Sequence, residues 1–349
     1  MQYTTLGNTG LVVSRLAFGA MTFSSGNRDM PALYKVEESV ADRLVGLALD
    51  GGINFFDTAD VYARGQSEEI LGRALASRRS QVVIATKVGG RFGKDLNDAG
   101  LSRRHILASV DGSLRRLGTD WIDVYIAHRF DPITPMEETL SALDAVVRAG
   151  KVRYIGFSNW SAWQVAAAME MTKANGLTPF THGQMYYSLL GRDIEHEFVP
   201  MLQRYGLGLT TWSPLSGGIL SGKYREQTSG DARLDTMDMM PIDKAAAEAA
   251  LAQLDAVAKA RSATVAQVAL AWLLAKPDVT SVILGAAKLP QLEDNLGAAP
   301  IVLTGEEVAA LDAATAVATP YPAWFLQRYG DKILNRALGR EVENGKDAK

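Results

Sequence analysis

Short apolar runs alternate with longer segments of helical periodicity along most of this chain. An apolar run of about four to eight residues is typical of a buried strand, and apolar residues that recur every three or four positions are typical of an amphipathic helix. The eight apolar runs lie at residues 16–19, 54–58, 82–86, 122–128, 152–158, 180–185, 207–213 and 281–284. Strands that alternate with helices predict a parallel sheet, and eight of them predict a closed (β/α)8 TIM barrel.

The helical segments have recognisable ends. A capping box is predicted at Thr134, with Gly150 following that helix, and a second box is predicted at Ser161, with Gly176 following. Two more helices are expected between the seventh and eighth apolar runs. A further amphipathic helix is expected around 305–314.

The two ends of the chain depart from this alternation. Residues 1–13 alternate and turn at Gly7-Asn8, which predicts a short β-hairpin. Residues 300–349 are expected to hold the extra helix, then the irregular aromatic segment "TPYPAWFLQRYG", and then a polar, flexible end. No long linker or change of composition divides the chain, so we expect a single domain over 1–349.

The composition is that of a folded soluble protein and excludes several kinds of chemistry. The chain has 349 residues, of which 47% are hydrophobic and 21% charged, and this length can bury a sizeable core. The absence of cysteine excludes disulfides, thiolate metal ligands and a cysteine nucleophile, and no metal site is expected. A formal charge of −3 gives no reason to expect nucleic acid as a partner. Without a signal-peptide pattern or an apolar run of about 18 residues, we expect a cytoplasmic protein without a membrane span.

Four polar residues at the predicted strand ends have the side chains that general acid catalysis on a carbonyl group requires. Asp57 ends the second strand, Lys87 the third and His128 the fourth, and Tyr62 lies in the loop after Asp57. The carboxyl ends of the strands carry the chemistry in a barrel of this kind. An ammonium beside a phenol lowers the phenol pKa from about 10 and makes it a better acid. A carboxylate keeps that ammonium charged, and a histidine can donate a hydrogen bond to a carbonyl or move its proton.

Each of these residues also has an ordinary structural explanation. Asp57 could cap a turn, and Tyr62 could be a packed aromatic ring. Lys87 could be a solvated charge on the rim, and His128 could be a core histidine. Four such residues at successive strand ends make coincidence the less favoured alternative.

Five segments resemble the aldo-keto reductase superfamily in order and spacing. They are "GINFFDTADVYARGQSEEILG", "VVIATKVGG", "DVYIAHRFDPITPMEETLSALDAVVRAGKVRYIGFSN", "TWSPLSGGILSGKY" and "GAAKLPQLEDNL", within about residues 3–315. The resemblance implies a catalytic tetrad of Asp57, Tyr62, Lys87 and His128, with Tyr62 as the general acid. It also implies NADPH or NADP⁺ bound across the barrel mouth, and no G-x-G-x-x-G follows the first strand.

The resemblance further implies which residues bind this cofactor. Ser158, Asn159 and Gln184 would hold the nicotinamide carboxamide, Trp212 would stack on the nicotinamide ring, and Lys223 would neutralise a phosphate. The remaining implied positions are Ala20, Met21, Asp57, Ser213, Pro214, Leu215 and Gly217 on the nicotinamide and pyrophosphate side, and Gly285, Lys288, Gln291, Asp294 and Asn295 on the adenosine side. A plain turn at "SPLSGG" and a core position for the tryptophan are the structural alternatives.

The adenosine loop departs from the family pattern. The family usually has proline before the glycine and often serine or arginine two or three positions later, whereas this chain has Leu284 and Lys288 there. Lys288 could still meet a 2′-phosphate, and Arg233 could help. We therefore expect NADPH to be preferred over NADH.

The sequence is compatible with three functions. A carbonyl reductase that uses NADPH, converting an aldehyde or ketone to an alcohol or the reverse, is favoured, with that small molecule as its partner. A cofactor-binding regulatory subunit comes second, because the potassium-channel β subunits share the fold and the "WSPL…GKY" motif. Those subunits carry asparagine where this chain has His128, which favours catalysis. A glycosidase barrel comes third, and it would need a second strand-end acid facing Asp57.

The substrate pocket is expected to draw on aromatic residues from two parts of the chain. Phe23 and Trp160 follow the first and fifth predicted strands, and Tyr321, Trp324 and Phe325 belong to the aromatic tail, which we expect over the barrel mouth. An ordinary packed tail is the alternative. Neither the substrate nor the oligomeric state follows from the sequence.

Overall fold

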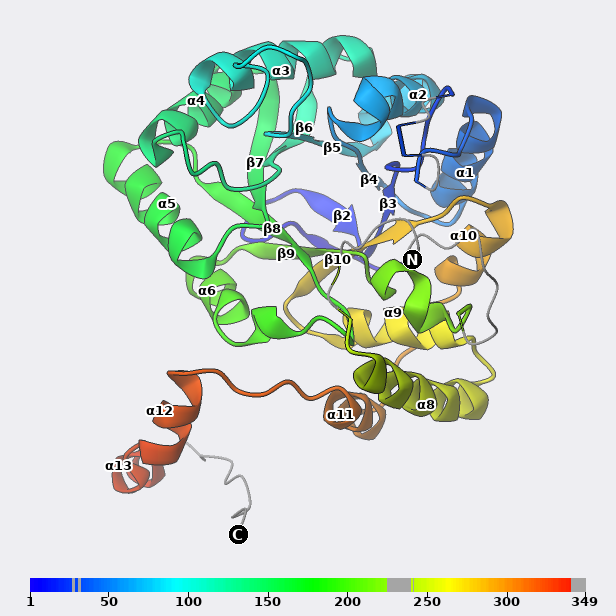
Figure 1. Ribbon diagram of the computed structural model, residues 1–349, viewed down its shortest axis with the longest axis vertical. Helices are drawn as coiled ribbons and strands as arrows, with labels where there is room; N and C mark the ends of the chain where they lie inside the picture. Colours follow the sequence, from blue (N-terminus) through cyan, green and yellow to red (C-terminus); the bar gives the residue numbers. More distant parts are fainter. Residues whose placement is uncertain (27–28, 31–32, 225–239, 241, 340–349) are drawn as a thin grey trace.

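A barrel of parallel strands surrounded by helices forms the body of the protein (Figure 1), seen here in a computed structural model. The structure describes residues 1–26, 29–30, 33–224, 240 and 242–339. The barrel strands are β3 (Leu16–Gly19), β4 (Phe55–Asp57), β5 (Val83–Val88), β6 (Ile122–Ala127), β7 (Val152–Ser158), β8 (Phe180–Tyr186), β9 (Gly208–Trp212) and β10 (Val279–Gly285). They pair in chain order, and β10 pairs with β3 to close the barrel. The predicted (β/α)8 barrel is confirmed.

Helices other than the last two cover the outside of the barrel, so both faces of the strands are buried. The helices are α1 (Glu38–Asp50), α2 (Gln66–Leu75), α3 (Arg103–Leu117), α4 (Met136–Arg148), α5 (Ala162–Asn175), α6 (Phe198–Tyr205), α8 (Lys244–Arg261), α9 (Val265–Ala275), α10 (Leu289–Leu296), α11 (Gly305–Ala314), α12 (Ala323–Tyr329) and α13 (Lys332–Ala337). Short 3-10 segments are η1 (Tyr62–Gly65), η2 (Ala76–Gln81), η3 (Asp193–Glu195) and η4 (Ser216–Ser221). Strand β5 is buried along its whole length, as parallel strands between two layers require.

One of the two predicted capping boxes is present and the other is wrong. Helix α5 begins with the box at Ser161 and is followed by Gly176 in the left-handed conformation, with φ 62°. Helix α4 begins after Pro135 without a side-chain cap. The hydroxyl of Thr134 instead donates a hydrogen bond to Asp131 Oδ2 at 2.7 Å, so it is not available to the helix.

The predicted amino-terminal hairpin closes one end of the barrel. Strand β1 (Tyr3–Thr5) pairs antiparallel with β2 (Val12–Ser14). Gly7, in the turn, has φ 57°, and a Cβ there would lie 2.6 Å from the backbone nitrogen of Gly208. Because Gly208 begins β9, the hairpin turn packs against the amino ends of the strands. The carboxyl ends, opposite, form the open mouth.

The carboxyl-terminal segment differs from the expectation of an irregular tail over the mouth. It forms α12 and α13, and these two helices stand apart from the barrel beyond α11 (Figure 1). The Asp331 carboxylate caps α13 by accepting from the N–H groups of Ile333 and Leu334, at 2.9 and 3.0 Å. The aromatic rings of α12 pack on one another, with centroids of Phe325 and Tyr329 4.7 Å apart.

Candidate active site at the barrel mouth

Strand periodicity places three members of the candidate tetrad in one layer inside the barrel. Successive strand residues point to opposite faces, so every second residue points inwards. The inward positions nearer the hairpin are apolar and form one buried cluster, which includes Phe55, Val83, Ala85, Val124 and Ile126. The next positions in the same alternation are Asp57, Lys87 and His128. An apolar floor therefore supports a polar layer at the mouth.

Lys87 is the centre of this layer. Its ammonium donates hydrogen bonds to Asp57 Oδ1 at 2.6 Å, to the Thr58 carbonyl at 2.7 Å and to the Tyr62 hydroxyl at 3.2 Å. The Lys87 residue is 0% exposed and Asp57 4% exposed, so the ion pair is shielded from water. Burial lowers the pKa of Lys87, but Asp57 and Tyr62 raise it above its usual value. The ammonium therefore stays charged at neutral pH.

The tetrad tyrosine is a protonated phenol in this site. Burial raises the pKa of Tyr62 above its usual value, and the nearby charge of Lys87 offsets only part of this rise. The sequence-based expectation of a lowered phenol pKa is therefore wrong in sign for the protein alone, because desolvation exceeds the attraction of the ammonium. A phenol that keeps its proton at neutral pH is ready to act as an acid.

A strained loop fixes the position of Tyr62. The next two residues, Ala63 and Arg64, have φ of 47° and 54°, which is unusual for residues other than glycine. Such strain persists only where the surroundings hold it. Ala63 is fully buried, and the Arg64 guanidinium pairs with Asp29 at 2.6 Å.

His128 lies beside the phenol and is neutral. Its ring meets the Tyr62 ring edge-on, with centroids 5.7 Å apart and planes at 81°. Although part of this residue remains accessible to solvent, burial and the charges of Lys87 and Arg129 lower the pKa of His128 to about 3. A neutral imidazole can donate a hydrogen bond to a substrate oxygen but is a poor proton donor.

The residues implied for the nicotinamide form a chain of hydrogen bonds that reaches the tetrad. The Gln184 side-chain amide donates to Asp57 Oδ2 at 2.9 Å, and the Ser158 hydroxyl donates to the Gln184 carbonyl at 2.7 Å. The Asn159 amide donates to the His128 carbonyl at 3.1 Å, and the Trp212 indole donates to Asn159 Oδ1 at 3.2 Å. The structure thus brings these four residues together beside Asp57 and His128.

The turn after β9 is tight and lies beside a lysine. Ser213, Ser216, Gly217 and Gly218 have φ of 52°, 49°, 66° and 99°, so the turn is tight. The N–H groups of Ser216, Gly217 and Gly218 are hydrogen-bonded within it, to the Ser213 carbonyl at 2.9 Å, Ser213 Oγ at 3.2 Å and the Leu215 carbonyl at 2.8 Å. At Gly218, which has φ 99°, a Cβ would lie 2.5 Å from Lys223 Cε, so a larger residue there would be strained and would displace the lysine side chain from the turn. The Lys223 ammonium beside this tight turn suits a phosphate group.

The implied adenosine positions are partly accessible. Gly285, Lys288 and Gln291 are exposed around the start of α10. Asp294 is engaged elsewhere, because its carboxylate accepts from Thr264 Oγ1 at 3.1 Å and from Gln267 Nε2 at 3.0 Å.

The remaining implied positions are divided between the site and the core. The Ala20 N–H donates to the carbonyl of Asp57 at 2.8 Å, and Met21 follows it at the end of β3. Pro214 and Leu215 lie in the turn after β9, and Asn295 is buried on α10. Arg233 lies outside the described residues.

The expected pocket aromatics are not on an open surface of the mouth. Phe23 is 0% exposed and Trp160 2% exposed, so both belong to the core behind the site. Trp160 packs edge-on against Phe130, with centroids 5.1 Å apart. Trp324 lies on α12, apart from the barrel (Figure 1).

Comparison with known proteins identifies the family. The model of the family described as "Aldo/keto reductase family" matches residues 15–316. The chain belongs to this family. Relatives described as probable voltage-gated potassium channel subunit beta occur in Oryza sativa subsp. japonica and Arabidopsis thaliana. The rice protein is 40% identical over 328 residues, covering 90% of this chain and 96% of the relative. The Arabidopsis protein is 38% identical over 315 residues, covering 86% and 92%.

A bacterial relative carries an oxidoreductase description. The protein YrpG of Bacillus subtilis (strain 168), described as an uncharacterized oxidoreductase, is 38% identical over 318 residues, covering 88% of this chain and 93% of the relative. Family membership and this relative support an oxidoreductase. In the part of this aldo/keto reductase that the structure describes, no helix has the length and apolarity needed to cross a membrane.

Sequence reasoning missed Tyr186 in this aldo/keto reductase. Its ring packs beneath Trp212, with centroids 5.2 Å apart, and its hydroxyl lies 3.2 Å from Ser216 Oγ. The Ser188 hydroxyl lies 2.8 Å from the same Ser216 oxygen. The signal was present in the sequence, because residue 186 follows Gln184 at the strand period of two and therefore shares its face.

A second buried acid lies close to the tetrad in this reductase fold. Asp60 is 1% exposed, and neither of its carboxyl oxygens has a hydrogen-bond partner of good geometry among the described residues. Burial and the neighbouring carboxylate of Glu68 raise the pKa of Asp60 to about 8, against the opposing effects of Arg116 and the Val61 N–H. In the unfolded chain the same group ionises near pH 4.

Asp60 should therefore make the protein less stable as the pH rises from about 4 to about 8, because the folded state keeps a proton that the unfolded state releases. An asparagine cannot ionise. We expect Asp60→Asn to change the melting temperature little at pH 4 and to raise it by about 5 °C at pH 9. Thermal melts across this range test the expectation, with Asp50→Asn, an exposed aspartate at the end of α1, as the control. An equal effect of Asp60→Asn at both pH values would contradict it.

Proposed function

We propose that this protein reduces an aldehyde or ketone to an alcohol, or catalyses the reverse oxidation, with NADPH as the hydride donor and Tyr62 as the proton donor. One observation carries the proposal. The Lys87 ammonium lies 2.6 Å from Asp57 and 3.2 Å from the Tyr62 hydroxyl at the barrel mouth, with His128 beside the phenol. This arrangement provides a protonated acid, a cation that stabilises its conjugate base, and a neutral hydrogen-bond donor.

Each residue has a separate part in the chemistry. Tyr62 and His128 orient the carbonyl oxygen by hydrogen bonding, which places its carbon for attack. Tyr62 donates its proton as negative charge develops on that oxygen. Lys87 stabilises the phenolate that remains, and Asp57 holds the ammonium in place and balances its charge.

The residues around the mouth fit a nicotinamide dinucleotide. Such a cofactor would supply the hydride. The flat face of Trp212 suits an aromatic ring, and the turn from Ser213 to Gly218 suits a pyrophosphate, because its glycines leave room for Lys223. Lys288, exposed at the start of α10, could meet a 2′-phosphate. These positions support the proposal that the cofactor is NADP(H).

Lys288→Glu should discriminate between the two forms of the cofactor. A glutamate would replace a charge-assisted contact to the 2′-phosphate with repulsion, so we expect NADPH affinity to fall by about 1–3 kcal/mol, or roughly 5–150-fold. NADH lacks this phosphate, and its affinity should change by less than about twofold.

Fluorescence titration with both cofactors measures the effect. Lys276→Glu would not be a matched control, because Lys276 is bonded to Asp312. Lys173→Glu, at an exposed lysine on α5, is the better control. Equal affinity of the parent protein for both cofactors would overturn the preference.

The activity itself is tested with a panel of aldehydes and ketones, followed by the absorbance of NADPH. Reduction of at least one carbonyl compound, lost in Tyr62→Phe, is the expected result. NADPH binding without any turnover would support a second candidate, a cofactor-binding regulatory subunit. The observation that favours this candidate is the 40% identity to a rice protein described as a probable potassium channel subunit beta.

A further inference from the structure

The carboxyl-terminal arm, residues 321–338, exposes more apolar surface than a folded monomer normally does. It comprises α12 and α13, which stand apart from the barrel (Figure 1). Its large apolar side chains include Tyr321, Trp324, Phe325, Leu326, Tyr329 and Ile333, which are between 43% and 85% exposed. An aromatic side chain can bury about 150–250 Å², so these exposed fractions amount to on the order of 700 Å². The largest apolar patch of a typical monomer is about 300–600 Å².

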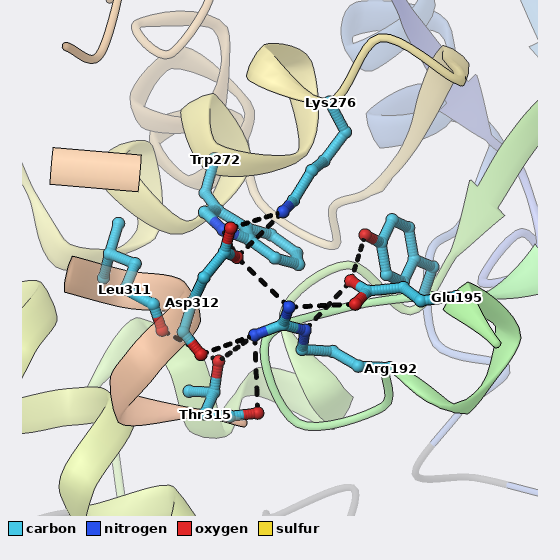
Figure 2. Close-up of polar contacts among 8 residues, drawn as sticks. Arg192, Glu195, Trp272, Lys276, Leu311, Asp312 and Thr315 are labelled. Atoms are coloured by element: carbon cyan, nitrogen blue, oxygen red, sulfur yellow. Dashed lines mark hydrogen bonds and ion pairs between the residues drawn. The ribbon is translucent and has the colours of Figure 1, made fainter. Parts of the chain in front are cut away.

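The root of this arm is held rigidly on the barrel. Figure 2 shows Arg192, in the loop after β8, donating to the Asp312 carbonyl at 2.8 Å and to Thr315 Oγ1 at 3.0 Å, where α11 ends. Its other nitrogens donate to the Glu195 carboxylate, each at 2.9 Å. The Tyr187 hydroxyl donates to the same carboxylate at 2.6 Å. Arg192 is only 8% exposed, so this network is shielded from water.

Side chains at the end of helix α9 also bind the end of α11. The Asp312 carboxylate accepts from the indole of Trp272 at 2.9 Å and from the ammonium of Lys276 at 2.8 Å (Figure 2). The chain beyond Thr315 therefore leaves the barrel from a fixed point. Residues 316–320 have no helix or strand, and five residues reach at most about 18 Å. The arm is therefore connected to the barrel by a short segment that begins at a fixed point, whereas a frayed terminus has no such anchor.

The barrel mouth carries a second exposed apolar surface, which we call the mouth rim. It consists of Phe92, Leu96, Ile133 and Trp163, which are 40%, 92%, 90% and 66% exposed. These residues follow the neighbouring strands β5, β6 and β7. The loops after β5 and β6 are joined, because the Leu101 N–H donates to Asp131 Oδ2 at 2.7 Å, and Trp163 lies in the first turn of α5. The rim adjoins the tetrad, which lies at the ends of β4, β5 and β6.

The arm is opposite in charge to the part of the mouth rim around Ile133. The part around Phe92 and Leu96 is not opposite to the arm, since residues 89–104 include four basic and two acidic residues, a net charge of +2. The arm has three basic residues and one acidic residue, a net charge of +2. The rim segment 129–140, around Ile133, has one basic and three acidic residues, a net charge of −2, and its Glu137 and Glu138 are exposed. Opposite charges around an apolar centre favour and orient association.

We propose that two copies of this chain exchange their arms, so that the arm of one copy covers the mouth rim of the other and completes its substrate pocket. The area fits this occupant, since the arm exposes close to the roughly 800 Å² that each partner of a stable complex contributes. The exchange also explains why the arm stands apart from its own barrel. The part of the proposal that concerns the substrate rests on the proposed carbonyl reduction, whereas the dimer does not.

Light scattering on the full chain at micromolar concentration tests the dimer. We expect a dimer for the parent protein and a monomer for Ile133→Asp, which places a charge in the centre of the rim. Val302→Asp is the matched control, because Val302 is 70% exposed but lies on the chain between α10 and α11. It should remain a dimer. A monomeric parent protein, or a dimer that survives Ile133→Asp, would overturn the proposal.

A hybrid experiment tests whether the arm acts on the other copy. The variant Trp324→Ala/Phe325→Ala keeps the tetrad and loses the two largest rings of α12, and we expect its KM for a carbonyl substrate to rise about tenfold. Adding excess Tyr62→Phe protein, which has an intact arm and a kcat expected to be about 10²–10⁴-fold lower, should return KM to within about twofold of the parent value. Tyr62→Phe protein that also carries the two arm substitutions is the control and should not restore it.

The outcomes separate the two proposals. A dimer whose KM is not restored by the intact-arm partner would overturn the arm exchange and leave carbonyl reduction in place. A dimer that dissociates with Ile133→Asp but reduces no carbonyl compound would overturn the proposed activity and support the interface.

Discussion

Replacing Tyr62 with phenylalanine is expected to lower kcat for carbonyl reduction by about 10²–10⁴-fold, the usual contribution of general acid catalysis. The change removes one oxygen and keeps the ring, so the packing against His128 remains. NADPH affinity should stay within about threefold of the parent value, a difference below 1 kcal/mol. Steady-state rates and cofactor titration measure the two quantities separately.

The control for this substitution removes a phenol oxygen elsewhere. Tyr205→Phe deletes a hydroxyl that donates to Glu170 on the outside of the barrel, and kcat should be unchanged. A deuteride isotope effect on kcat establishes that hydride transfer limits the rate. If Tyr62→Phe then keeps more than about a tenth of the parental kcat, Tyr62 is not the acid.

Lys87→Met should lower kcat by a similar factor for a different reason. Methionine has nearly the length of lysine but no charge, so the Tyr62 phenolate would form without the cation that stabilises it. The double variant Lys87→Met/Tyr62→Phe should be little slower than either single variant, because the two residues act as a unit. If the double variant lowers kcat by the product of the two single reductions, the lysine acts independently of the phenol.

This second substitution also leaves the buried Asp57 without its ion-pair partner, although Gln184 still donates to it at 2.9 Å. Loss of one partner of a buried pair costs about 3–5 kcal/mol. A thermal melt must therefore confirm that Lys87→Met is folded at the assay temperature. Lys151→Met, which breaks the more exposed pair with Asp111, is the matched control and should change neither kcat nor, by more than about 1 kcal/mol, stability.

The sequence predicted the barrel, and the proximity of four polar residues at its mouth, because both depend on short-range patterns. An apolar run of strand length marks each strand, and the strand end that follows it holds Asp57, Lys87 or His128. The structure brings these residues and Tyr62 into contact. Their chemical roles stay predictions.

Features that depend on burial or on contacts between distant residues could not be predicted from short-range sequence patterns. The sign of the Tyr62 pKa shift follows from how much solvent the fold removes, which no local motif states. The network around Arg192 joins side chains as far apart in sequence as Thr315. The helix at 323–329 had a visible signal, since Tyr321, Phe325 and Tyr329 recur every four residues, but the prolines before it suggested an irregular tail.

The order of functional residues along the chain has an evolutionary consequence. The tetrad lies within residues 57–128, whereas most positions implied for the cofactor lie within residues 158–295. Two hydrogen bonds described above join the sets, from Gln184 to Asp57 and from Asn159 to the His128 carbonyl. Under the proposed function, substitutions in the later segment other than those at Gln184 and Asn159 alter nucleotide preference without touching Tyr62. The two traits would then diverge separately among descendants of one gene.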